Sequence, residues 1–154
     1  MFRFIKFLPL FFEDFEAGTE YRTRARTVTE TDVVSFAGLS GDFNSLHTDA
    51  EFMKESPTGE RIAHGMLIVA IASGLSNQMG WFDGTTLALA EVASKFKAPV
   101  RFGDTIHAVF TLNEKKPSSK PDRGIVILNT SIRNQRDEPA IEGTWTLLMK
   151  RKVA

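Results

Sequence analysis

The sequence predicts an α+β domain in which a curved antiparallel sheet wraps around one long central helix. Residues 65–75 include no charged side chain, which is typical of a helix buried on most of its sides. Beyond residue 79, alternating or apolar runs separated by polar turns predict strands, at 87–100, 105–115, 124–134 and 141–151. Strands that follow one another around a single apolar helix favour an α+β arrangement.

The segment before this helix predicts one further strand and two short helices. Residues 21–28 alternate strictly, with three arginines on one face, and predict a half-buried strand. A solvated arginine face is the simplest interpretation, and phosphate binding is the alternative. Residues 29–32 predict the start of a helix that ends at Gly38 or Gly41, and residues 48–54 predict a second short helix.

Length and composition favour one domain over residues 1–154, with residues 1–15 as an N-terminal arm. The 19 acidic and 19 basic side chains balance, so no bulk attraction to nucleic acid or to an anionic membrane is expected. The arm begins with an apolar run that Lys6 interrupts, and acidic residues follow without a small-residue cleavage site. We therefore interpret it as a packed arm or an interface element and not as a signal peptide.

Cysteine and histidine usage narrows the chemistry. The chain has no cysteine, which excludes disulfides, thiolate metal sites and thiol nucleophiles and is compatible with the cytoplasm. Its 3 histidines show no close pairing in the sequence, so no metal site is expected. His107 falls on the more polar face of its strand, and we expect it at the surface.

The loop around residues 40–47 carries a candidate acid/base pair. Asp42 and His47 would point about 140° apart on a helix, so they can share a proton or a water only across an irregular loop. Gly41, Asn44 and Ser45 favour such a loop. Histidine exchanges protons near neutral pH, and a carboxylate can orient it or act as its partner acid. The alternative is that these residues only form turns and a cap.

The start of the long helix offers a candidate site for a negatively charged oxygen. Gly65 leaves backbone N–H groups uncovered where the helix dipole favours negative charge. The small residues farther along the helix allow close contact with a sheet or with a thin ligand. Ser73 has the one hydrogen-bonding side chain between Gly65 and Leu75, so if buried it needs a partner, for which Asp42 is a candidate.

These segments together resemble a known family. The order Phe36, Ser40-Gly41-Asp42, Asn44-Ser45-Leu46-His47 and His64-Gly65-Met66 resembles the motif of the MaoC-like (R)-specific enoyl-CoA hydratases, also called hydratase 2. A second block, Phe96 to Val100 followed by Gly103-Asp104, resembles the strand and turn after the helix in that family. One departure is Ser45, where the family usually has proline. Because proline restricts φ, its loss is expected to loosen the loop and to affect efficiency more than chemistry.

The resemblance implies a hot-dog fold, a homodimer or dimer-based oligomer, and reversible hydration of trans-2-enoyl-CoA to (R)-3-hydroxyacyl-CoA without a cofactor. It implies that Asp42 and His47 hold the water and exchange its protons, while the Gly65 N–H binds the thioester oxygen. Supporting or substrate-binding roles are assigned to Asn44, Ser73, His64 and Met66. Candidates for contacts with coenzyme A phosphates are Lys95, Lys97 and Arg101, although an exposed strand end is the simpler interpretation of each.

Two other functions stay open at this point. A thioesterase on the same fold would release free coenzyme A from a saturated acyl thioester. A non-catalytic subunit would bind an acyl thioester and keep the loop only for its shape. The Asp-x-x-x-x-His loop favours the hydratase over both.

Overall fold

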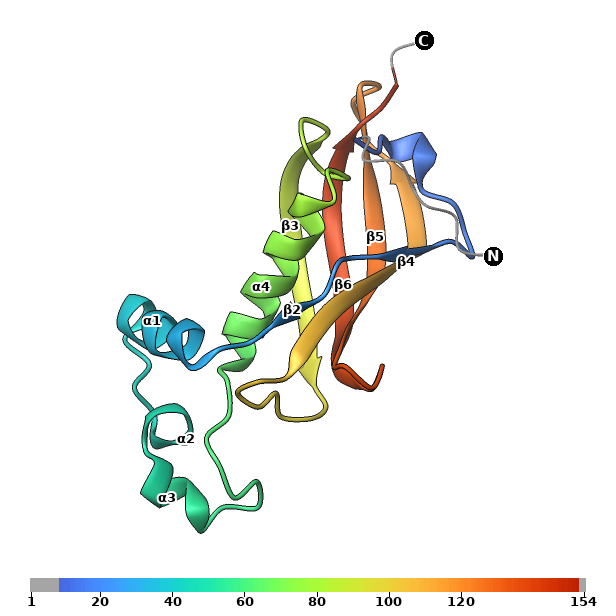
Figure 1. The fold of residues 1–154 in the computed structure, drawn as a ribbon. Helices are drawn as coiled ribbons and strands as arrows, with labels where there is room; N and C mark the ends of the chain where they lie inside the picture. The colour runs from blue at the N-terminus through green and yellow to red at the C-terminus, as the bar shows by residue number, and fades with distance from the viewer. Residues whose placement is uncertain (1–8, 153–154) are drawn as a thin grey trace.

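The computed structural model describes residues 9–152, and it shows one antiparallel sheet curved around a single long helix, α4 (Figure 1). The six strands are β1 (Glu20–Arg22), β2 (Arg26–Thr27), β3 (Thr86–Phe96), β4 (Thr105–Pro117), β5 (Arg123–Arg133) and β6 (Pro139–Lys150). The helices are η1 (Phe12–Asp14), α1 (Glu30–Ser40), α2 (Ser45–Thr48), α3 (Ala50–Lys54) and α4 (Gly65–Gln78). The architecture confirms the predicted α+β class.

The sheet has the strand order β1-β4-β5-β6-β3, and β2 pairs with β4. The four predicted strands after the helix are confirmed, with small shifts at their ends. The strand predicted at 21–28 is instead broken between β1 and β2. At the break, the Thr23 hydroxyl accepts the Ala108 N–H at 2.9 Å, so a side chain replaces one backbone bond of the ladder. Period-2 alternation gives no sign of such a replacement.

Helix α4 packs one side against the concave face of the sheet. Leu67, Ile68, Ala72 and Leu75 are buried there, as the uncharged stretch predicts. Ala70 and Gly74, however, are exposed. The buried residues also include Val69, Ile71 and Ser76, so the helix is buried over more than half of its circumference, and the exposed residues form one stripe. Within residues 9–152, no helix is both long and apolar enough to cross a membrane.

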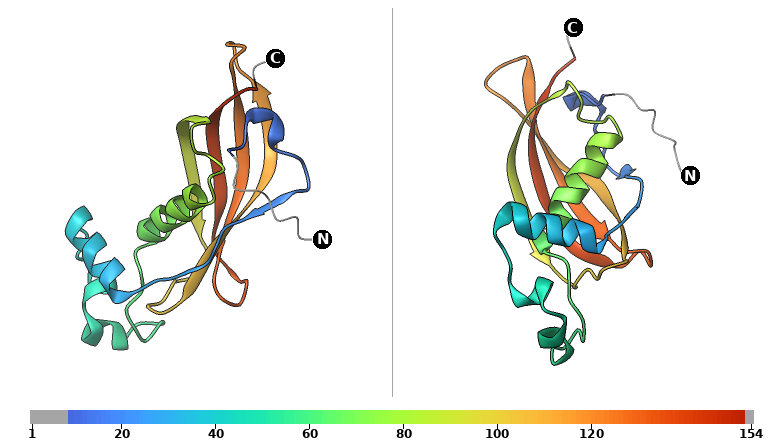
Figure 2. Two further views of the ribbon diagram at one scale, coloured as in Figure 1. Left: turned by 45° about the horizontal axis from the view of Figure 1, so that its top comes forward. Right: turned by 60° about the vertical axis from the view of Figure 1, so that its left-hand side comes forward.

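Helices α1 to α3 project beyond the start of α4, away from the sheet (Figure 2). Helix α1 begins with a capping box, in which Thr29 accepts the Asp32 N–H and the Asp32 carboxylate accepts the Thr29 N–H. It ends at Gly41, whose φ of 78° is readily adopted only by glycine. These two ends confirm the predicted helix and set the point from which the next loop departs.

The part of the N-terminal arm that the structure describes is packed. The Leu10 N–H donates to the Trp81 carbonyl at 2.8 Å, and Phe15 is buried. The Phe12 ring lies against Gly124. The ammonium group of Lys115 and the guanidinium group of Arg151 make cation–π contacts with the same ring. Residues 1–8 of the predicted arm lie outside the described residues.

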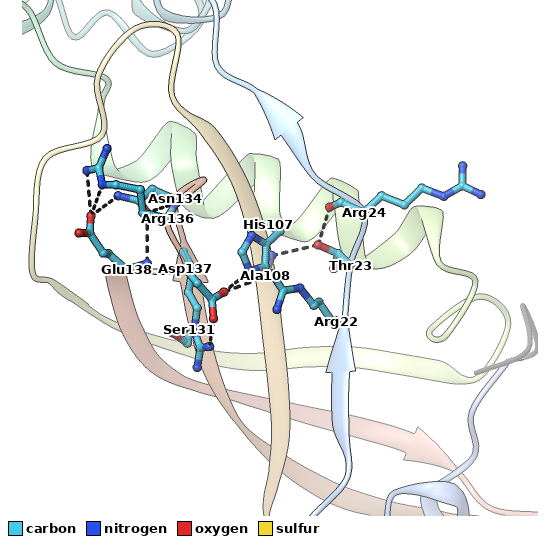
Figure 3. Close-up of polar contacts among 11 residues, drawn as sticks. Arg22, Thr23, Arg24, His107, Ala108, Ser131, Asn134, Arg136, Asp137 and Glu138 are labelled. Atoms are coloured by element: carbon cyan, nitrogen blue, oxygen red, sulfur yellow. Dashed lines mark hydrogen bonds and ion pairs between the residues drawn. The ribbon is translucent and has the colours of Figure 1, made fainter. Parts of the chain in front are cut away.

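The prediction that His107 lies at the surface is wrong. Only 5% of it is exposed, and its Nε2 is 3.0 Å from Asp137 Oδ1 (Figure 3). Arg22 and Arg133 pair with the same carboxylate. The loop between β5 and β6 folds Asp137 back over β4, with a φ of 63°. Alternation within one strand cannot reveal a neighbouring loop that covers it.

Burial lowers the pKa of His107, and the positive charge of Arg22 lowers it further, against the opposing effect of Asp137. Desolvation alone would raise the pKa of Asp137. The positive charges of Arg22 and Arg133 outweigh this effect and hold the pKa below its usual value. The neutral form of His107 is therefore favoured in the folded state.

This burial predicts a dependence of stability on pH. The unfolded chain binds a proton at His107 near pH 6.5, whereas the folded chain does so only at a lower pH. The stabilising effect is present above about pH 6.5 and is lost as the pH falls towards the folded pKa. We expect the Tm of His107→Gln to fall less than that of the wild type between pH 7.5 and 5.5, measured by thermal denaturation. An equal or larger fall in the variant would contradict the assignment.

Candidate active site

A tight loop after α1 carries Asp42 and leads into α2. One carboxylate oxygen of Asp42, Oδ1, accepts the Asn44 N–H at 3.2 Å, and the Asn44 side chain accepts the Leu46 N–H at 3.0 Å. Asn44 is thus the N-cap of α2, and Ser45 occupies the first helical position. Proline is favoured at that position, but here the cap supplied by Asn44 fixes the turn without it.

His47 is buried in α2 and held by a backbone carbonyl. Its Nδ1 lies 2.7 Å from the carbonyl oxygen of Ile62, and 8% of the residue is exposed. Because a carbonyl oxygen only accepts, Nδ1 carries a proton, and in the neutral ring Nε2 then carries the lone pair. His47 is therefore oriented with a basic nitrogen that is not used by the hydrogen bond to Ile62.

The loop brings together three titratable side chains. Asp42, His47 and His64 each offer one nitrogen or oxygen atom, and these atoms lie within 4.8 Å of one another. This separation is within reach of a bridging water. The structure thus places the two sequence-predicted acid/base candidates side by side, with His64 against both.

The same three residues form an unsuitable metal site. The rings of His47 and His64 are stacked, with centroids 3.7 Å apart and planes 28° apart. Metal ligands bind through lone pairs in the ring plane at about 2 Å. The planes of two rings stacked in this way intersect much farther than 2 Å from the ring nitrogens. The lone pairs of His47 and His64 therefore do not point at one ion. The expectation that no metal takes part stays a prediction.

An apolar cavity of about 550 Å³ opens beside His47. It lies between the first turn of α4 and the segment that follows β3. Its lining residues are His47, Thr58, Ile62, Ala63, Gly65, Met66, Ile68, Phe96, Lys97, Ala98, Pro99, Val100 and Ile141. The cavity therefore combines one titratable ring with a largely apolar wall, which suits a ligand that has a reactive end and a hydrocarbon part.

Gly65 starts α4 at this cavity, and the His64 side chain does not cap the helix. Its glycine identity also has a packing reason. A Cβ atom at residue 65 would lie 2.7 Å from Cδ1 of Phe96 and would overlap the ring. Phe96, which the sequence did not single out as a site residue, thus lies directly over the helix start. Phe96 belongs to the second block of the family resemblance, and this was the one feature of the sequence that could have indicated its place at the site.

The remaining predicted residues fall in different places. Ser73 is two turns farther along α4 than Gly65, about 12 Å by the helical rise. It is partly exposed, and no hydrogen bond joins it to Asp42 among the described residues. The expected contact is therefore not present, because the hydroxyl is not buried and needs no protein partner. Met66 is exposed and lines the cavity.

Of the three candidates for phosphate contacts, only Lys97 lines the cavity. Its ammonium group is 3.6 Å from Glu142, and both side chains are about half exposed. Arg101 pairs with Glu60. Lys95 is an exposed residue on β3 and is not part of the cavity wall.

The fold and site define a hot-dog protein with an apolar cavity, which His47 lines beside Asp42. A double hot-dog protein of Mycobacterium tuberculosis has the same fold, with a TM-score of 0.78 at 16% identity over 94% of this chain and 45% of that one. The family model of the MaoC like domain matches residues 14–131, and this chain belongs to that family.

Two relatives show how close the similarity is. An (R)-specific enoyl-CoA hydratase of Rhodospirillum rubrum is 36% identical over 110 residues, which are 71% of this chain and 74% of the relative. The crystal structure of a monoamine oxidase regulatory protein from Archaeoglobus fulgius has a TM-score of 0.86 at 35% identity, covering 95% of this chain and 97% of that one. The resemblance of fold and family inferred from the motif is confirmed.

The contact between Gly65 and Phe96 can be tested by stability alone. Gly65→Ala should lower the free energy of unfolding by about 1 kcal/mol or more, because the new methyl overlaps the ring. With Phe96→Ala, the same change should become neutral or stabilising, by up to about 1 kcal/mol. Gly38→Ala in α1, where open space surrounds the glycine, is the matched control and should stabilise. If Gly65→Ala stabilises as much as the control with Phe96 present, the contact is refuted.

Proposed function

We propose that this chain catalyses the reversible addition of water to a trans-2-enoyl thioester, giving a (R)-3-hydroxyacyl thioester, with coenzyme A as the carrier. The observation that carries the proposal is that His47, which lines an apolar cavity beginning at Gly65, lies beside Asp42. The Rhodospirillum rubrum relative, named as an (R)-specific enoyl-CoA hydratase, supports the same reaction.

Hydration requires a group that takes a proton from water and a group that returns one to C2. The oriented Nε2 of His47 accepts the proton as the water oxygen bonds to C3. As the O–C3 bond forms, the C2–C3 π electrons shift towards the thioester carbonyl, whose oxygen becomes negatively charged. Protonation of C2 then restores the carbonyl. Asp42 holds the water, and the two groups act as one coupled pair, so delivery to C2 is assigned to the pair.

The charge on the thioester oxygen needs a donor where it develops. The Gly65 N–H at the start of α4 is the proposed donor, since the helix dipole adds to the hydrogen bond. The acyl chain would extend along the apolar wall formed by Ile68, Val100 and Ile141. Lys97 at the cavity is the preferred candidate for a coenzyme A phosphate. A cofactor-free reaction in the cytoplasm remains a prediction.

The acid/base pair is tested by substitution. We expect Asp42→Asn and His47→Gln each to lower kcat on crotonyl-CoA by at least about a hundredfold, the usual scale for such a group. Loss of the enoyl-thioester absorbance is the measurement, and circular dichroism confirms the fold. His107→Gln, which removes a buried histidine far from the cavity, is the control and should keep near-normal kcat. Near-normal turnover by either site variant would remove that residue from the mechanism.

We further propose that the active form is a homodimer in which a second copy covers β3. Leu89, Val92 and Phe96 pair with Leu147, Trp145 and Ile141 of β6. Those three β6 residues are buried. The three β3 residues nevertheless expose 45%, 40% and 55%. Strand β3 is also an edge strand, so its outer backbone groups are available for pairing. An apolar edge of this kind is typical of a covered interface.

Light scattering after gel filtration tests this interface. The wild type should have twice the chain mass of 17.2 kDa. Val92→Lys should shift the population towards the monomer, because an ammonium group would be buried at the interface. Leu39→Lys, at an apolar residue of α1 that is 85% exposed, is the control and should leave the dimer unchanged. A monomeric wild type, or a Val92→Lys dimer of unchanged affinity, would contradict the proposal.

A further inference from the structure

The His64 side chain contacts both members of the proposed acid/base pair. Its Nε2 lies 2.9 Å from the backbone carbonyl oxygen of Asp42. Its ring stacks on that of His47, with centroids 3.7 Å apart. Only 2% of the residue is exposed to solvent. It is not among the residues that line the cavity.

The hydrogen bond fixes which nitrogen of His64 carries the proton. The Asp42 carbonyl only accepts, so Nε2 must donate and Nδ1 must carry the lone pair. Nδ1 is buried and has no hydrogen-bond partner among residues 9–152. A proton placed there would be a buried donor without an acceptor, which is unfavourable. His64 and His47 thus adopt opposite tautomers, each set by a backbone carbonyl.

Packing leaves the His64 ring little freedom. The Phe36 ring of α1 meets it edge to face, with centroids 5.0 Å apart. His47 covers another side of it. Although His64 precedes the first residue of α4, its side chain makes no cap bond to that helix. Its donor is directed across to the loop after α1 instead.

We infer that His64 is a positioning residue that fixes the spacing between Asp42 and His47. The hydrogen bond holds the Asp42 backbone, and the ring stack holds His47 at the same time. Both act through a side chain anchored at the start of α4. The inference rests on the proposed hydration reaction, in which a misplacement of about 1 Å can cost a hundredfold in rate. It predicts an effect on kcat and not on substrate binding.

The tautomer is tested without any activity measurement. With only 3 histidines in the chain, ¹⁵N-labelled histidine gives a spectrum that His47→Gln and His107→Gln assign. At pH 8.5, above the ordinary pKa of histidine, His64 should show a protonated Nε2 and a bare Nδ1. His47 should show the reverse. A proton on Nδ1 of His64 would overturn the inference, whether or not the protein is a hydratase.

Two variants test the effect on rate. His64→Leu removes both the donor and the stacked ring, and we expect kcat on crotonyl-CoA to fall at least about tenfold, with KM within about threefold. His64→Gln restores a donor for the Asp42 carbonyl and should recover part of the loss. Unchanged kcat in His64→Leu, or a rise in KM alone, would overturn the inference.

The controls separate this inference from the proposed function. An inactive wild type refutes hydration of this substrate, and the tautomer measurement then decides the position of His64 by itself. His107→Gln should keep kcat within about twofold, because an equally buried histidine outside the site does not contact the pair. If His64→Leu does not fold, the comparison of His64→Gln with the wild type and the tautomer measurement remain decisive.

Discussion

Burial of α4 against the concave face of the sheet is the constraint on which the candidate site depends. Leu67, Ile68 and Leu75 fix the helix in the core, and each is less than 10% exposed. The start of the helix is thereby fixed as well, including Gly65 and the preceding His64. Helices α1 to α3 project away from the sheet. Their position relative to the cavity therefore depends on a few contacts with this fixed helix start.

Backbone carbonyls make the most specific of these contacts. Ile62 accepts from His47, and Asp42 accepts from His64. Ile62 is in turn fixed, because its N–H donates to Leu46 and because it forms an isolated bridge with Arg101. Hydrogen bonds thus connect Arg101, the segment before α4, and the loop and short helix that carry Asp42 and His47. Backbone carbonyls thus orient both imidazole rings.

The exposed side of the chain has a common pattern. Leu89, Val92 and Phe96 of β3 and Ala70 and Gly74 of α4 are all exposed. Phe96 belongs to this exposed set and also lies over Gly65 in the cavity wall. A second copy that covers β3 would therefore lie next to the site. The proposed dimer interface and the proposed donor at Gly65 would therefore meet at Phe96.

Much of this structure could be predicted from local patterns, and the failures have physical causes. The start of α1 at residues 29–32 was predicted from the sequence, and of the two predicted ends, Gly38 and Gly41, the structure has Gly41. The alternation of the later strands located β3 to β6. The predicted proximity of Asp42 and His47 followed from turn chemistry and from the family motif, and the structure places them together.

Contacts between distant segments could not be read in this way. His107 is covered by a loop thirty residues farther along the chain, which period-2 alternation does not encode. The break at Thr23 depends on a hydroxyl that replaces a backbone partner on β4. A contact between Ser73 and Asp42 was expected, but the side of α4 that carries Ser73 is partly exposed. The contacts of His64 required the ring positions themselves.

The most direct test of the proposed reaction is to incubate crotonyl-CoA with the protein in H₂¹⁸O and to analyse the products by mass spectrometry and chiral chromatography. The account predicts ¹⁸O at C3 of an intact (R)-3-hydroxybutyryl-CoA. Label in a free carboxylic acid, with release of coenzyme A, would instead indicate a thioesterase. Binding of crotonyl-CoA without any incorporation of label would contradict catalysis by the Asp42 and His47 pair and would indicate a binding subunit.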